Sequence, residues 1–333
     1  MKGNLLEIKN LTLHFKEYRG LLKVLDRVNF TVGYKENIGI IGEAACGKTT
    51  TMKAIMRILS MTSAKITQGE ILFKGRDILK MNGAEIQEIR REGISMIFQD
   101  PTAALNPVFT IKSQINNIIK YLGRQKKKLT KREIKAQGIK ILSDVMLPDP
   151  ERILESYPFQ LSGGMRQRIC IAIALLSSHN LLIADEPGTS LDVTIEDQIY
   201  RLLEDVAKEK QISMIFISHA LGVVKNITNR TYVMYAGSMV EVAKTAELFT
   251  NCLHPYSQAL IASVPKLTGE GTPQGIQGSI PGYLNPPPGC RFSPRCSHAM
   301  PICKAKKPPF FNIKDGHQVA CWLFKKGRDQ VGK

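Results

Sequence analysis

The sequence predicts an α/β fold in which helices cover a largely parallel β-sheet. Short apolar runs typical of buried strands recur along the chain, and helical patterns follow Lys48, Gly164 and Asp192. Residues 11–15 alternate between apolar and polar side chains, as in a half-buried strand. The predicted buried strands span residues 38–41, 94–98, 181–184, 214–217 and 232–235.

The chain of 333 residues is longer than one compact core usually holds, so we expect more than one domain. Residues 100–160 carry mostly helical patterns, which predicts a helical insertion. From about residue 250, Pro and Gly become frequent, as in residues 286–289, and helical periodicity fades. We therefore predict a main domain over residues 1–250 and a loop-rich C-terminal extension over residues 251–333.

The bulk composition excludes global disorder, because 43% of the residues are apolar and 23% are charged. The net charge of +17 favours anionic partners such as nucleotides, nucleic acid or acidic membrane surfaces. Part of it is local to residues 123–140, a basic stretch compatible with either lipid headgroups or a solvated face. The longest apolar run, residues 169–176, is far shorter than the roughly 20 residues of a membrane span. The N-terminus lacks a signal-peptide pattern, so we expect a cytosolic protein without structural disulfides.

A phosphate-binding loop is predicted at residues 42–49, which satisfy the pattern G-x-x-x-x-G-K-[ST] between a strand and a helix. Loop N–H groups and the helix N-terminus bind phosphates in such loops. Lys48 is expected to reach the β- and γ-phosphates, and the Thr49 hydroxyl to ligate Mg²⁺. Cys46 is either a small filler or a thiol open to oxidation. The expected ATP contacts here are Gly42, Glu43, Ala44, Ala45, Cys46, Gly47, Lys48, Thr49 and Thr50.

An acidic pair ends the predicted strand at residues 181–184. In phosphoryl-transfer sites the first acid, here Asp185, serves Mg²⁺, and the second, Glu186, polarises the attacking water. Upstream, residues 161–168 read Leu-Ser-Gly-Gly-Met-Arg-Gln-Arg at the start of a helix. The serine and the two glycines offer a hydroxyl and N–H groups to an anion.

These motifs together resemble the Walker A, signature and Walker B sequences of ATP-binding-cassette (ABC) ATPases. The resemblance implies an ABC-type P-loop NTPase fold with a RecA-like core, a β subdomain and a helical subdomain at about residues 100–160. It also implies a head-to-tail pair of ATPase domains, so that the signature of one, through Ser162, Gly163, Gly164 and Gln167, contacts the ATP of the other.

Further positions fit the same family pattern. The resemblance assigns Gln99 to the Q-loop, which senses Mg²⁺, and residues 190–192 to the D-loop. It makes His219 the switch histidine that contacts the γ-phosphate, so that the predicted catalytic residues are Lys48, Glu186 and His219. Phe15 is the expected adenine-stacking residue, with Tyr18 as the alternative.

A metal site is predicted in the C-terminal extension, where four cysteines crowd together. Their spacing, C-x5-C-x6-C-x17-C, differs from that of common zinc ribbons, and four thiolates suit either Zn²⁺ or an iron–sulfur cluster. The predicted ligands are Cys290, Cys296, Cys303 and Cys321.

The whole chain resembles the ATP-binding subunits of oligopeptide and dipeptide importers. The resemblance rests on residues 254–260, 281–296, 99–107 and 233–237. It implies a heterodimer with a second ATPase, two transmembrane permeases, an extracytoplasmic peptide-binding protein, and a peripheral location on the cytoplasmic side of the membrane. It favours a [4Fe–4S] cluster over zinc. Departures from the usual family residues are Phe159, Gly188 and Ala220.

Alternatives to peptide import remain open from the sequence. Paralogues with such extensions import nickel or oligosaccharides. The basic charge and the cysteines are also compatible with a soluble ABC ATPase acting on nucleic acid, or with a nucleotide-binding sensor of iron or redox state. The importer-like extension argues against a nucleic-acid partner, which we do not expect.

Overall fold

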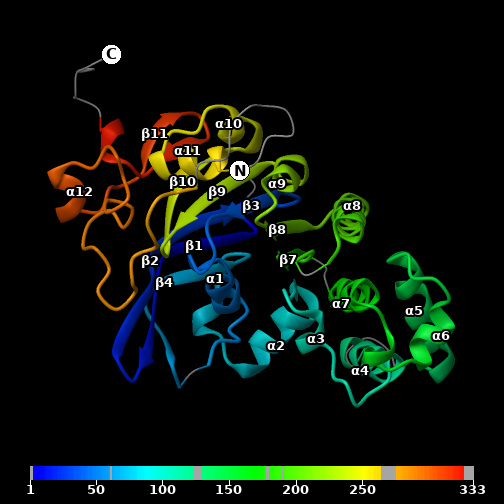
Figure 1. Cartoon of the computed structure of the whole chain (residues 1–333). Helices are drawn as coiled ribbons and strands as arrows, with labels where there is room; N and C mark the ends of the chain where they lie inside the picture. Colours follow the sequence, from blue (N-terminus) through cyan, green and yellow to red (C-terminus); the bar gives the residue numbers. More distant parts are fainter. Residues whose placement is uncertain are drawn as a thin grey trace. The chain divides into compact units, whose positions relative to one another are not determined.

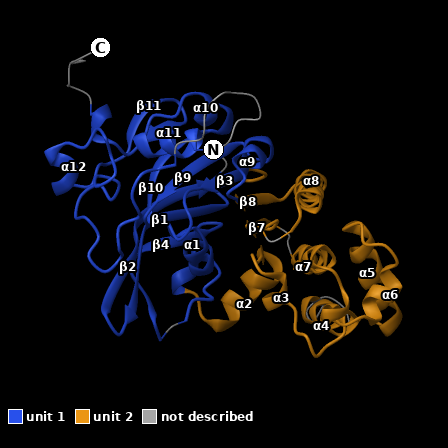
Figure 2. Cartoon of the chain, in the orientation of Figure 1, with its two compact units in different colours: residues 1–33, 37–80, 218–333 blue, residues 34–36, 81–217 orange. Residues whose placement is uncertain are grey.

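A computed structural model describes residues 3–60, 62–123, 129–177, 180–189, 191–263 and 275–325. It divides into two compact units (Figure 2). The first comprises residues 1–33, 37–80 and 218–333, and the second residues 34–36 and 81–217. Ser190 of the predicted D-loop and residues 124–128 of the basic stretch lie outside the described residues.

The first unit contains an antiparallel sheet in the order β2-β1-β4-β5. Its strands are β1 (Leu6–Glu17), β2 (Gly20–Val32), β4 (Ala64–Phe73) and β5 (Arg76–Asp77). A two-residue connection, Tyr18 and Arg19, joins β1 to β2, and such short connections produce antiparallel pairs. The inward side chains of β1, among them Leu11 and Leu13, are fully buried, as the alternation predicted.

The second sheet of this unit runs in the order β11-β12-β10-β9-β3. Its strands are β3 (Asn37–Ile41), β9 (Arg230–Tyr235), β10 (Ser238–Lys244), β11 (Phe311–Lys314) and β12 (His317–Val319). β3 and β9 are parallel, whereas β9–β10, β10–β12 and β12–β11 are antiparallel. The predicted buried strands at residues 38–41 and 232–235 are β3 and β9, and they are parallel as predicted. The antiparallel strands β10, β11 and β12 were not predicted, and two-residue turns join β9 to β10 and β11 to β12.

The first unit also contains helices, most of which are labelled in Figure 1. They are α1 (Lys48–Ile55), η1 (Ile78–Lys80), α9 (Leu221–Ile227), α10 (Thr245–Thr250), α11 (Pro255–Ala262), α12 (Pro301–Ala305) and η3 (Trp322–Phe324). The predicted boundary after residue 250 stays a prediction. In the structure the later chain packs within this unit, since β12 pairs with β10 through Val319 and Glu241.

The second unit has a parallel sheet in the order β8-β7-β6, formed by β6 (Ile94–Ile97), β7 (Leu181–Asp185) and β8 (Ser213–Ile217). All residues of these strands are buried, as the uninterrupted apolar runs predicted. Its helices are α2 (Gly83–Glu92), α3 (Pro101–Ala104), α4 (Ile111–Gly123), α5 (Lys131–Asp144), α6 (Pro150–Glu155), η2 (Pro158–Gln160), α7 (Gly163–Ser177) and α8 (Val193–Lys210). Within the described residues, no helix is long and apolar enough to cross a membrane.

Candidate nucleotide-binding site

The predicted phosphate-binding loop connects β3 to α1 in the first unit. Lys48, at the first position of α1, is 4% exposed, and its Nζ donates to the carbonyl oxygens of Gly42 at 2.9 Å and Glu43 at 3.0 Å. The Lys48 side chain thus reaches back from the end of the loop to the two residues at its start. This is the arrangement that a phosphate-binding lysine requires, because phosphate oxygens can replace such carbonyl acceptors.

Three residues give the loop its shape through left-handed backbone conformations. Ala45 has a φ of 59° and Gly47 a φ of 108°. Gly42 has a φ of 155°, and a Cβ there would lie 2.1 Å from the carbonyl oxygen of Met234. Only glycine fits such a close backbone approach. The thiol of Cys46 is fully buried, and burial raises its pKa, so the structure favours the small-filler interpretation over a reactive thiol.

The other predicted nucleotide contacts of the first unit are less buried. Phe15 is half-buried in β1, opposite Leu22 and Ala64, whereas Tyr18 in the β1–β2 turn is fully exposed. His219 is exposed just before α9, where the Oγ of Ser218 accepts the N–H of Ala220 at 3.0 Å. Ala220 thus stands at the helix start without a side-chain cap of its own.

The predicted acidic pair ends β7 in the second unit. Asp185 is 1% exposed and Glu186 is 7% exposed. Glu186 has a φ of 49°, an uncommon conformation for a residue with a Cβ, and its N–H donates to Ile217 O at 2.9 Å. Gln99 Nε2 donates to Glu186 Oε2 at 2.8 Å, so the structure joins the Q-loop glutamine to the predicted water-polarising acid.

Thr189 and Gly188 complete the surroundings of Glu186. The Thr189 hydroxyl donates to Glu186 Oε2 at 3.4 Å. A Cβ on Gly188 would lie 2.5 Å from Cγ of Glu196 and 2.8 Å from the Tyr200 hydroxyl. A side chain at position 188 would therefore require Glu196 and Tyr200 to move.

The predicted signature opens α7. The exposed Ser162 caps this helix, because its Oγ accepts the Met165 N–H at 3.3 Å, and Gly163 and Gly164 follow at half-buried positions. A Cβ on Gly164 would lie 2.8 Å from Ile195 Cγ2, so close packing of α7 on α8 requires a glycine. Gln167 differs from expectation. It is 1% exposed, and neither amide atom has a hydrogen-bond partner in the described part of the chain, so its contact with a partner's ATP stays a prediction.

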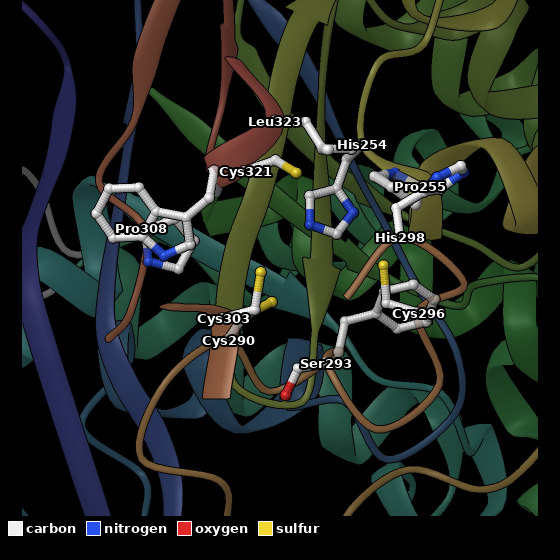
Figure 3. Close-up of a pocket in the computed structure, with 12 residues that line it drawn as sticks. His254, Pro255, Cys290, Ser293, Cys296, His298, Cys303, Pro308, Cys321 and Leu323 are labelled. Carbon is white, nitrogen blue, oxygen red and sulfur yellow. The ribbon is translucent and has the colours of Figure 1, made fainter. Parts of the chain in front are cut away.

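The four cysteines of the extension line one pocket, together with His254 and His298 (Figure 3). Their thiols are free, and the Met300 N–H donates to Cys303 Sγ at 3.5 Å. Burial raises the pKa of Cys290 to about 11 and that of Cys321 to about 12. Among the described residues, however, no three His, Cys, Asp or Glu side chains are grouped closely enough to hold a metal ion. The donor set therefore has the chemistry of a soft metal site without its assembled geometry.

Comparison with known proteins decides the family. Residues 25–189 match the ABC transporter family model, and residues 240–303 match the model of the oligopeptide/dipeptide transporter C-terminal region. The dipeptide transport ATP-binding protein DppD of Bacillus subtilis is 42% identical over 96% of this chain and 94% of its own length. The chain belongs to the ATP-binding subunits of peptide ABC transporters. It is thus an ABC transporter ATPase, as the motifs predicted.

Other relatives agree with this assignment. The oligopeptide transport ATP-binding protein OppD of Bacillus subtilis is 41% identical over 96% of this chain and 88% of its own length. Among solved structures, the ATP-binding cassette MJ0796, in a dimeric post-hydrolysis state bound to ADP and phosphate, has a TM-score of 0.64 at 24% identity, over 72% of this chain and 98% of that one. This likeness shows the fold. The peptide-transport relatives give no support to the alternative of an ATPase acting on nucleic acid.

Proposed function

We propose that this ATPase energises the import of dipeptides or oligopeptides, at the cytoplasmic side of the membrane, as part of a complex. Its partners would be a second, different ATPase subunit, two transmembrane permeases and an extracytoplasmic peptide-binding protein. The observation that carries the proposal is the match to peptide transporters over both the ATPase region and residues 240–303. Nickel and oligosaccharide importers are the alternatives.

In the proposed site, Lys48 and the loop N–H groups bind the phosphates of ATP, and Phe15 stacks on adenine. Thr49, Gln99 and Asp185 serve Mg²⁺. The hydrogen bond between Gln99 and Glu186 supports a shared role of the two side chains, in which Glu186 polarises the attacking water.

His219 contacts the γ-phosphate in this proposal. The capped N-terminus of α7, with Ser162, Gly163 and Gly164, binds the ATP held by the partner subunit. ATP then holds the two subunits together, and its hydrolysis releases them, which drives the permeases.

Uptake into vesicles that contain the chain with its permeases and second ATPase tests the transport assignment. ATP inside the vesicles should drive uptake of labelled di- or tetrapeptides, and Lys48→Ala should abolish it together with ATP hydrolysis. ATP-driven uptake of nickel or an oligosaccharide, without peptide uptake, would contradict the proposal.

We further propose that Cys290, Cys296, Cys303 and Cys321 hold a [4Fe–4S] cluster, with zinc as the alternative. The support is that the four free thiols line one pocket and that an N–H donates to one of them. When bound, such a group would cross-link the loops of the extension. Anaerobic purification with iron, sulfide and zinc analysis tests this. About four iron and four sulfide per chain, lost in Cys296→Ser, are expected, whereas stoichiometric zinc without iron would refute the cluster.

A further inference from the structure

Three side chains from the C-terminal extension contact the phosphate-binding loop, all within the first unit. The hydroxyl of Tyr256, in α11, accepts the Glu43 N–H at 2.8 Å. The hydroxyl of Tyr283 donates to Ala45 O at 2.6 Å. Arg295 Nη1 donates to both carboxylate oxygens of Glu43, at 3.0 and 3.1 Å. The extension therefore holds the loop from outside at two of its residues.

The guanidinium of Arg295 is fixed before it meets Glu43. Its side chain is 4% exposed, whereas that of Glu43 is 27% exposed. Nε donates to Gln277 O at 2.8 Å, Nη2 donates to Ile276 O at 3.0 Å, and Nη1 donates to the Tyr235 hydroxyl at 3.2 Å. Because these acceptors already fix the arginine, its ion pair with Glu43 costs little further side-chain entropy. A surface ion pair between two free side chains costs more.

The two tyrosines are also held by the surrounding structure, Tyr256 by burial and the half-buried Tyr283 by its backbone. Tyr256 is fully buried, and its ring centroid lies 4.5 Å from that of Tyr235 and 5.4 Å from that of Phe292. The carbonyl oxygen of Tyr283 accepts the Lys23 N–H at 2.8 Å. Its hydroxyl thus holds the carbonyl of Ala45, the residue with the left-handed backbone, in a fixed direction.

The charge of Glu43 gives the ion pair a second consequence. A carboxylate in a loop that binds a triphosphate repels the phosphates, because both carry negative charge and lie close together near the protein surface. Arg295 cancels this charge through both oxygens. The repulsion of an unpaired Glu43 would be larger for ATP than for ADP, because ATP carries one phosphate more.

We propose that Arg295, Tyr256 and Tyr283 are positioning residues of the ATP site, with Arg295 neutralising Glu43 so that the loop accepts a triphosphate. The proposal rests on the assignment of residues 42–49 as the phosphate-binding loop. The C-terminal extension is then a part of the nucleotide site and not only an addition to the ATPase domain.

Equilibrium binding of Mg·ATP and Mg·ADP to the full chain, by calorimetry, tests this. Arg295→Met should raise the Kd for ATP about tenfold, which corresponds to about 1.4 kcal/mol, and that for ADP by less. Arg295→Lys should retain most of the affinity, because it keeps the charge. Glu43→Gln combined with Arg295→Met should return the Kd to within about twofold of the wild type.

Lys307→Met is the matched control for lost stability. Lys307 is another largely buried cation of the extension, and its Nζ pairs with Asp26 Oδ2 at 2.9 Å and donates to Ser238 Oγ at 3.0 Å, neither of which is a residue of the phosphate-binding loop. The Lys307→Met variant should unfold at a lower urea concentration than the wild type but bind ATP with an unchanged Kd. An unchanged Kd in Arg295→Met, an equal loss in Lys307→Met, or an equal loss for ATP and ADP that Glu43→Gln does not relieve would overturn the proposal. Normal ATP binding by Lys48→Ala would instead refute the loop assignment itself.

Discussion

Glu241 is the residue whose loss we expect to destabilise the C-terminal extension most. It lies in β10 and is fully buried. Its Oε1 accepts the Leu253 N–H at 2.7 Å and the His317 Nε2–H at 2.8 Å, and its Oε2 accepts the His254 N–H at 2.9 Å. One carboxylate therefore joins β10 to two separate segments of the extension, the residues before α11 and strand β12.

Replacing Glu241 by alanine leaves these buried donors without their acceptor. Each unsatisfied backbone N–H costs about 1–3 kcal/mol, and breaking a buried charged network costs about 3–5 kcal/mol. We therefore expect Glu241→Ala to lower the free energy of unfolding of this region by about 4 kcal/mol, within that range.

The single tryptophan, Trp322, makes the effect measurable. Its indole N–H donates to Lys306 O at 2.9 Å within the extension, so its fluorescence reports unfolding there. Urea titration of the full chain should show a much lower midpoint for Glu241→Ala. Lys314→Ala is the control, because among the described residues the exposed Lys314 pairs only at the surface with Glu247, and its loss should leave the midpoint nearly unchanged. A loss below about 1 kcal/mol in Glu241→Ala would refute the network argument.

Further predictions concern the second unit. Glu186→Gln should lower ATP hydrolysis by about 10²–10⁴-fold in a single-turnover assay while ATP binding persists, because glutamine keeps an acceptor for Gln99 but no basic carboxylate; wild-type turnover would rule out Glu186 as the base. Gly188→Ala should reduce the free energy of unfolding by about 1–3 kcal/mol through its clash with Glu196, whereas Gly222→Ala, in open space, should not; equal urea midpoints would contradict the packing argument. Burial raises the pKa of Cys170 to about 12, so the folded state holds its proton between pH 9 and 12 and the unfolded state does not. Wild-type stability should therefore fall faster than that of Cys170→Ala as pH rises through this window, and parallel pH profiles would argue against the shift.

The sequence by itself determined the family and the local chemistry. Each of these motifs is a short stretch of sequence: the phosphate-binding loop, the acidic pair and the signature. The local backbone conformation of such a stretch restricts which residue types it can contain. Gly42 and Gly47, for example, adopt conformations that a local pattern encodes. The buried strands were equally predictable, because an apolar run of four or five residues identifies a strand without reference to its neighbours.

Tertiary structure alone decided which distant side chains meet. Periodicity carries no information on pairing partners, so no sequence pattern indicates that Gln99 bonds Glu186 or that Gly188 faces Glu196. The same holds for Arg295, which meets Glu43 across 252 positions of the chain. The mixed sheet of the first unit arises in this way too, since the pairing of β12 with β10 depends on packing of the folded chain. Such contacts form because buried side chains must pack closely and buried polar groups must find hydrogen-bond partners in the folded chain. Through these contacts the loop-rich extension supports the phosphate-binding loop.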